Sequence, residues 1–130
     1  MPEPPEIRFL SLFVPDVAAA AQHYETLLGG PPVAAHGRAP DPHPFAGSEP
    51  VVFELGTVLI ALYQANPNRG THPGDVGIGV RVDAPPSQVA ERARSCRAQV
   101  LYGPKRVPGD GRTLAVVMLP DRHFFELVDR

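Results

Sequence analysis

The sequence of 130 residues has one cysteine, one lysine and no tryptophan. A single cysteine, Cys96, cannot form an intramolecular disulfide, which is typical of a protein kept in a reducing compartment. No apolar run approaches the roughly 20 residues that a membrane-spanning helix needs. Residues 1–6 are prolyl and acidic, unlike the basic and apolar start of a signal peptide. We therefore expect a cytoplasmic protein with no membrane partner.

The chain also lacks a large excess of charge of one sign. The formal net charge is -2, and the basic residues, nearly all of them arginine, are scattered along the chain. Nucleic-acid-binding domains gather positive charge on one face, so nucleic acid is not an expected partner. The abundance of arginine, alanine and proline is typical of a GC-rich bacterial genome. The length suits one domain, residues 1–130, or two small repeats that share a core.

The start of the chain predicts a strand followed by a helix. Residues 7–14 are largely apolar on both faces, which indicates a central strand. Asp16 is placed to cap the helix that follows, because its carboxylate can accept the free N–H groups of the first turn. Apolar residues recur at helical spacing through residues 17–28, and Gly29 is the expected helix end.

The stretch from residue 31 to residue 50 is rich in proline and holds His36 and His43. We expect one short edge strand over residues 33–36 and otherwise a loop, because proline cannot donate to a strand ladder. Both histidines are predicted to be solvated. Whether this loop is an exposed connector or a lid is left open. Residues 51–64 then predict an antiparallel hairpin with a glycine at its turn.

The second half repeats this order. Residues 76–82 predict a strand, and a helix follows whose apolar stripe ends in Cys96, interpreted as core filling. Short strands over 99–102 and 113–119 flank a polar loop over 103–111, and a last strand closes the chain. Strand, helix and three strands are thus predicted twice, in repeats of residues 7–64 and 76–130 joined by a linker over 65–75.

The last strand carries a carboxylate in its middle. Alternation puts Phe124, Glu126 and Val128 on one face, with Phe125 and Leu127 on the other. From this segment alone, an exposed Glu126 on a solvated face is the better interpretation. A buried carboxylate is costly unless it binds a metal, a proton or a cation. A buried Glu126 would therefore indicate a functional site.

Two motifs show a resemblance to a known superfamily. The helix end Tyr24-Glu25-Thr26-Leu27-Leu28-Gly29 and the chain end Pro120-Asp121-Arg122-His123-Phe124-Phe125-Glu126-Leu127 resemble those of the vicinal oxygen chelate superfamily. This superfamily includes glyoxalase I, bleomycin-resistance proteins and extradiol dioxygenases. The resemblance covers residues 7–130, although Arg97 and Arg122 stand where glycine is usual. It implies an α+β fold of two βαβββ repeats that form a partly open mixed β-barrel with the helices outside, and it implies a homodimer.

Enzymes of this superfamily hold a divalent metal in the barrel. The resemblance matches the ligand positions to Phe9, Ala61, Gly77 and Glu126, of which only Glu126 can bind a metal. Protein sites for such ions need about three or more N, O or S ligands, so we expect a degenerate metal site and no cofactor. A divalent metal held by Glu126 together with one of the histidines is the alternative.

The resemblance also divides the strand residues between two faces. One set is implied to pack under the helices: Leu10, Leu12, Val14, Ile78, Val80, Val82, Phe125 and Leu127. The other is implied to line a ligand cleft: Phe9, Ser11, Phe13, Leu59, Ala61, Tyr63, Gly77, Gly79, Arg81, Phe124, Glu126 and Val128. Aromatic rings that face glycines and an alanine suit a flat, largely apolar small molecule. Arg81 and Glu126 either pair with each other or offer a ligand one cation and one anion.

Two functions are compatible with such a cleft. The first is a metal-independent binder of a small, largely apolar or aromatic molecule, similar to the drug-sequestering members that give antibiotic resistance from a groove shared between two subunits. Bleomycin binders carry tryptophan in that groove and this chain has none, so another ligand is expected. The alternative is a lyase, isomerase or dioxygenase that uses Glu126 as general base or metal ligand. A scaffold domain, the third reading, would fill the cleft with its own side chains.

Overall fold

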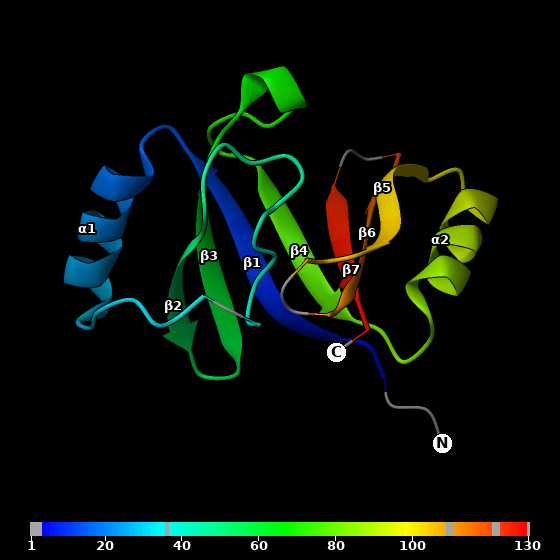
Figure 1. Ribbon diagram of the computed structural model, residues 1–130, viewed down its shortest axis with the longest axis horizontal. Coiled ribbons are helices and arrows are strands. Elements are labelled where there is room, and N and C mark those ends of the chain that lie inside the picture. The colour runs from blue at the N-terminus through cyan, green and yellow to red at the C-terminus, as the bar shows by residue number, and fades with distance from the viewer. Residues whose placement is uncertain (1–3, 36, 109–110, 121–122, 130) are drawn as a thin grey trace. The chain divides into compact units, whose positions relative to one another are not determined.

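The computed structural model describes residues 4–35, 37–108, 111–120 and 123–129. These residues form seven strands and two α-helices of a mixed α+β fold, so the predicted class is confirmed (Figure 1). The chain divides into two compact units. We call Phe9–Val76 the first-repeat unit, and Met1–Arg8 with Gly77–Arg130 the second-repeat unit. Within the described residues, no helix is long and apolar enough to cross a membrane.

The first-repeat unit contains a mixed sheet with the strand order β2-β3-β1 (Figure 1). β1 (Glu6–Val14) pairs in parallel with β3 (Val58–Gln64). β2 (Val51–Leu55) pairs with β3 in the antiparallel sense, which confirms the predicted hairpin. The parallel pairing places residues far apart in the sequence, such as Phe13 and Tyr63, side by side.

The helix α1 (Val17–Leu28) follows β1 and has the predicted bounds. The Asp16 carboxylate accepts hydrogen bonds from two N–H groups of the first turn, at 3.1 and 3.2 Å, as expected of a helix N-cap. At the other end Gly29 adopts a left-handed φ of 77° and donates its N–H to the Glu25 carbonyl at 2.9 Å. Both predicted helix ends are therefore confirmed.

The edge strand predicted over residues 33–36 is reduced to a single bridge, so that prediction is wrong. Val33 donates its N–H to the Val52 carbonyl at 2.8 Å, and His36 lies outside the described residues. Three prolines follow within residues 40–44, and proline cannot donate to a strand ladder. The first repeat consequently keeps two strands after its helix, where three were expected.

The second-repeat unit contains a sheet with the order β4-β7-β6-β5 (Figure 1). Its elements are β4 (Val76–Arg81), α2 (Pro86–Ser95), β5 (Gln99–Arg106), β6 (Thr113–Met118) and β7 (Phe124–Val128). β4 and β7 are parallel, whereas β5 with β6 and β6 with β7 are antiparallel. This unit has the full predicted order of strand, helix and three strands.

β5 continues to Arg106, so the first part of the loop predicted over residues 103–111 is wrong. The last two residues of β5 pair with the first two of β6, after two shifts of register. Such bulges admit Pro104 into a strand. Gly103 permits the bulge, because its φ is 68° and a Cβ there would overlap the Leu114 carbonyl oxygen.

The apolar core of the second-repeat unit includes α2 and strand residues that face it. The buried members are Val82, Ala115, Val117 and Leu127, and the half-buried members packed on them are Val80, Val89, Ala93, Val100 and Phe125. Val80, Val82, Phe125 and Leu127 had been assigned to this face. Their assignment is therefore confirmed for this unit.

Cys96 lies outside this core, so its interpretation as core filling is wrong. α2 ends at Ser95, and Cys96 is the exposed residue that follows, with its thiol donating to the Ala93 carbonyl. Arg97 then adopts a left-handed φ of 68°, and Ala98 takes the buried position. Helical spacing would place residue 96 on the core face only if the helix continued through it.

Candidate functional site

The pairing of β1 with β3 brings six of the predicted ligand residues into one row of the first-repeat unit. The row consists of Phe9, Ser11 and Phe13 opposite Leu59, Ala61 and Tyr63. Residues that are paired in register point to the same face of a sheet. The rings of Phe13 and Tyr63 stack with centroids 5.6 Å apart and planes inclined by 22°. Every member except Leu59, which is half-buried, is buried, so this row is covered.

Part of that cover is His43, from the proline-rich loop. Its side chain is only 2% exposed, so the prediction that His43 is solvated is wrong. The imidazole meets Phe13 edge-on at 5.1 Å and lies 4.8 Å from the Tyr63 ring. Its Nδ1 accepts the N–H of Phe45 at 3.1 Å. The structure thus adds His43 to the aromatic residues of this face.

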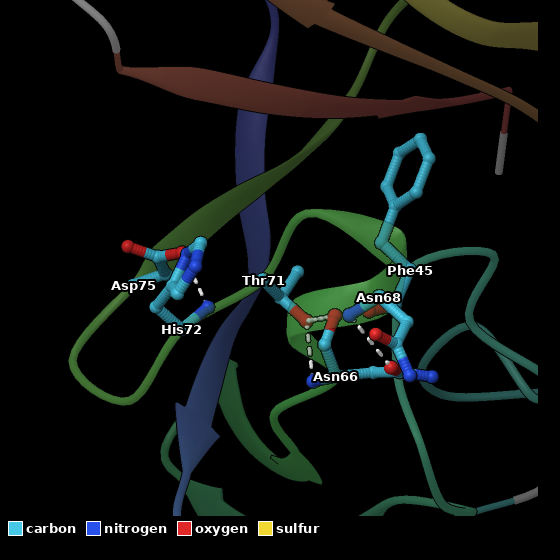
Figure 2. Close-up of polar contacts among 6 residues, drawn as sticks. All are labelled: Phe45, Asn66, Asn68, Thr71, His72 and Asp75. Atoms are coloured by element: carbon cyan, nitrogen blue, oxygen red, sulfur yellow. Dashed lines mark hydrogen bonds and ion pairs between the residues drawn. The ribbon is translucent and has the colours of Figure 1, made fainter.

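The segment around His43, residues 38–47, is here called the cover loop. Its Pro40 carbonyl accepts a hydrogen bond from the Tyr63 hydroxyl. The Thr71 hydroxyl donates to the Phe45 carbonyl at 2.6 Å and accepts the N–H of Asn66 at 2.8 Å (Figure 2). The loop is therefore tied to β3 and to the segment after it, and it is not an exposed connector. Ala39 and Ala46, on either side of His43, are buried with it.

The second-repeat unit forms another row from the remaining predicted residues. β4 and β7 place Gly77, Gly79 and Arg81 opposite Phe124, Glu126 and Val128. Glu126 is 0% exposed, so the interpretation of a solvated carboxylate on this strand is wrong. Two residues of the preceding turn, Asp121 and Arg122, lie outside the described residues. A carboxylate at this depth is the feature that would indicate a site.

Glycine at position 77 is what lets the Glu126 side chain lie where it does. A Cβ built on Gly77 would stand 2.5 Å from Glu126 Oε1 and 2.5 Å from Phe124 Cε2. Atoms this close cannot coexist without a shift. The space that a side chain at position 77 would take is therefore occupied by the Glu126 carboxylate and the Phe124 ring.

Arg81 is buried and is paired with the N-terminal segment of its own unit. Its Nε lies 3.7 Å from Glu6 Oε1, and its Nη2 donates to the Pro4 carbonyl at 3.2 Å. Glu6 also pairs with Arg8 at 2.9 Å. The predicted choice between an Arg81–Glu126 pair and two separate ligand anchors stays a prediction.

The residues at the superfamily's metal positions do not fit a divalent ion. Phe9, Ala61 and Gly77 carry no side-chain donor, which leaves Glu126. Across residues 4–35, 37–108, 111–120 and 123–129, no three His, Cys, Asp or Glu side chains gather in a way that could hold a metal. His23, His72 and His123 are exposed, and His72 lies beside Asp75 with Nδ1 3.9 Å from Oδ2 (Figure 2).

A cavity of about 450 Å³ lies elsewhere in the second-repeat unit, at the start of α2. Its walls consist of Val82, Asp83, Ala84, Pro85, Pro86, Ser87, Pro104, Thr113 and Asp129. The Thr113 N–H donates to Asp129 Oδ1 at 3.1 Å. None of the residues predicted to line the ligand cleft contributes to this cavity.

Solved structures of several enzymes share this fold. Methylmalonyl-CoA epimerase from Mycobacterium tuberculosis is 15% identical with a TM-score of 0.66, covering 94% of this chain and 85% of that chain. The Streptomyces coelicolor epimerase in complex with 2-nitronate-propionyl-CoA is 16% identical with a TM-score of 0.61, covering 94% of each chain. A 2,2',3-trihydroxybiphenyl 1,2-dioxygenase from Sphingomonas wittichii is 18% identical with a TM-score of 0.60, covering 94% of this chain and 41% of that one.

These likenesses establish the fold. The shared fold agrees with the fold that the sequence resemblance implied. No family model and no curated protein matches the chain. These comparisons therefore assign no activity to the chain.

Proposed function

We propose that this chain binds a small, largely apolar or aromatic molecule without a metal, on the aromatic row of the first-repeat unit. The observation that carries the proposal is the packing of Phe13, Tyr63 and His43 rings against one another at 4.8 to 5.6 Å. Phe9 and Ala61, which the resemblance matches to metal-ligand positions, add apolar surface to the same row. Such a surface gains binding energy from area and ring contacts and needs no ionic group.

Sequestration of an aromatic natural product is the biological role that this proposal includes. Protection by sequestration requires only that the free concentration of the compound falls. A protein with this role would need tight binding and no turnover. The row is covered by His43 in the structure, so a ligand must displace part of the cover in order to reach Phe13 and Tyr63.

The test uses quinoline as a flat aromatic probe and two matched Phe→Leu variants. Phe13 belongs to the proposed row, whereas Phe53 is equally buried but contacts Tyr24 of α1, with ring centroids 6.1 Å apart. Loss of a ring contact costs about 0.5–1.5 kcal/mol. Phe13→Leu should therefore weaken quinoline binding by about two- to tenfold, and Phe53→Leu should leave it unchanged.

Titrations followed by amide NMR of the full chain supply the measurement. Saturable binding with shifts at Phe13, Tyr63 and their neighbours is the expected result. Equal weakening by the two variants would show that the effect comes from general loosening of the fold. No saturable binding of quinoline or of a panel of larger aromatic compounds would refute the binding function.

A homodimer with a groove shared between two subunits is part of the same proposal. Three exposed leucines of the first-repeat unit, Leu27, Leu28 and Leu55, support a surface for a second copy, with Leu27 80% exposed. Sedimentation velocity of the native chain and of Leu27→Glu tests this. A dimer that dissociates in the variant is expected, and a native monomer at high concentration would contradict it.

An enzyme that uses Glu126 as general base is the second candidate. The buried Glu126 carboxylate beside Gly77 favours this candidate, because a base shielded from water can contact the C–H group of a substrate directly. The fold shared with methylmalonyl-CoA epimerases suggests a probe. Deuterium incorporation into methylmalonyl-CoA in D₂O, lost in Glu126→Gln with the fold intact, would establish proton abstraction. Exchange at the uncatalysed rate in both proteins would leave the binder as the better account.

A further inference from the structure

The His43 imidazole stands where a ligand ring would have to stand in order to contact both Phe13 and Tyr63. The planar ring makes a T-shaped contact with Phe13, with ring centroids 5.1 Å apart and ring planes inclined by 81°. Its centroid lies 4.8 Å from that of the Tyr63 ring. One ring nitrogen accepts a backbone N–H in the ring plane, from Phe45 at 3.1 Å. The side chain therefore has the shape and hydrogen-bonding of a small planar heterocycle bound at this face.

The backbone on both sides of His43 is anchored. Before it, the Pro40 carbonyl accepts the Tyr63 hydroxyl. After it, the Pro44 carbonyl accepts from Arg69 at 3.2 Å and the Phe45 carbonyl accepts from Thr71 at 2.6 Å. The Gly47 N–H donates to the Gln64 carbonyl at 2.8 Å.

These anchors are all on backbone atoms of the cover loop. Rotation about the side-chain bonds of His43 can move the imidazole away without breaking any of them, and such rotations are fast compared with loop opening. The Phe45 N–H would keep its direction, because it shares a peptide plane with the Pro44 carbonyl, which stays fixed to Arg69.

We propose, on the basis of the proposed function, that His43 is a displaceable ring that occupies the ligand subsite. The ligand's planar ring replaces the imidazole against Phe13 and Tyr63, and an acceptor in the ring plane takes the Phe45 N–H. The ligand class is therefore an aromatic nitrogen heterocycle or an aromatic carbonyl compound. A hydrocarbon of the same shape would leave the Phe45 N–H without an acceptor, and buried donors without partners are costly.

His43→Ala should remove the competing ring. The ligand would no longer have to break the ring contacts and the hydrogen bond that His43 makes, so quinoline should bind about tenfold tighter or better. His43→Asn serves as a second variant in case the alanine variant does not fold, because its amide oxygen can still accept the Phe45 N–H. His23→Ala, which removes an exposed histidine on α1, is the matched control and should not change the affinity.

The requirement for a ligand acceptor at the Phe45 N–H is tested by comparing the affinities of quinoline and naphthalene. Naphthalene has the same shape but lacks the ring nitrogen. Quinoline should bind the native chain and His43→Ala more tightly than naphthalene does. Arg69→Leu, which releases the Pro44 carbonyl on the peptide plane of this N–H, should reduce this preference, and Arg69→Lys, which keeps a cationic donor, should restore it. Equal affinities for the two probes in every variant would overturn the assignment of the Phe45 N–H.

The direct readout is the ¹⁵N spectrum of the His43 ring in the native chain during titration with quinoline. The expected result is that the signal of Nδ1 moves from that of a hydrogen-bonded acceptor to that of a solvated ring as the site fills. Saturable binding with unchanged His43 signals would overturn the displacement while leaving the binding function in place. Absence of quinoline binding in the native chain and in both His43 variants would instead refute the binding function itself.

Discussion

The two repeats share one plan of strand, helix and strands but close their corresponding rows differently. The first-repeat unit has two strands after its helix, and its proline-rich segment covers an aromatic row with His43. The second-repeat unit keeps all its strands and has small residues on the corresponding row, where Gly77 makes space for the buried Glu126. The difference shows that corresponding rows of the two units can be closed in two ways, by a covering loop or by side chains that occupy the space beside a glycine.

The helices show the same contrast. α1 begins at the Asp16 cap and ends at a left-handed glycine, as an isolated helix would require. α2 has Pro85 at its N-cap with no side-chain hydrogen bond, and an arginine in the left-handed position after it. α2 instead packs Val89 and Ala93 on its unit's core and buries Ala90, whereas α1 has no fully buried residue. Of the two helices, α1 has the stronger caps and the less buried surface.

The largest expected effect comes from breaking the small-residue row. Gly77→Ala should destabilise the chain by about 1–3 kcal/mol, because the new methyl group overlaps Glu126 and Phe124 and these must shift. Gly30→Ala is the control, since a Cβ at Gly30 meets nothing within 4 Å. Urea unfolding followed by circular dichroism measures both.

A coupled variant sharpens that test. If overlap with the carboxylate causes the loss, Glu126→Ala should recover part of it in the Gly77→Ala background, and the two changes will not be additive. Additive losses, or a Gly77→Ala variant as stable as Gly30→Ala, would show that the glycine is not required by Glu126.

A smaller effect is expected from removing the α1 cap. Asp16→Ala deprives two N–H groups of their acceptor and should cost about 1 kcal/mol. Asp16→Asn keeps an acceptor oxygen and should cost much less. The free energy of unfolding from urea titration gives the comparison, and equal losses in the two variants would point to the charge and not to the cap.

The smallest effect is a gain. Arg97→Gly relieves a left-handed backbone of φ 68°, and we expect about 0.5–1 kcal/mol of added stability. This change would make the end of α2 resemble that of α1. Thermal unfolding of Arg97→Gly beside Arg94→Gly, within the helix, tests it. A loss in the first variant as large as in the second would show that the left-handed position is not occupied in solution.

The face of each strand could be predicted from the sequence. Strand alternation separates Phe13 from Leu12 and Glu126 from Phe125, and the resemblance assigned Phe13, Tyr63 and Glu126 to one set. Their pairing across β1 with β3 and β4 with β7 came from the structure. The burial of those residues could not be predicted, because it depends on what covers the row. His43 was read as solvated from its proline-rich surroundings, and its contacts to Phe13 and Tyr63 come from strands 30 and 20 residues away in the sequence.

By itself, the sequence determined what depends on a few neighbouring residues: the bounds of α1, its caps, the hairpin of β2 and β3 and the side of each strand that a residue occupies. These follow from periodicity, capping chemistry and turn residues. Only the tertiary structure decided that β5 runs to Arg106, that Cys96 is exposed and that Glu126 and His43 are buried. Those outcomes depend on partners supplied by distant segments, such as β6 for β5 and Gly77 for Glu126, whose contacts no local pattern specifies.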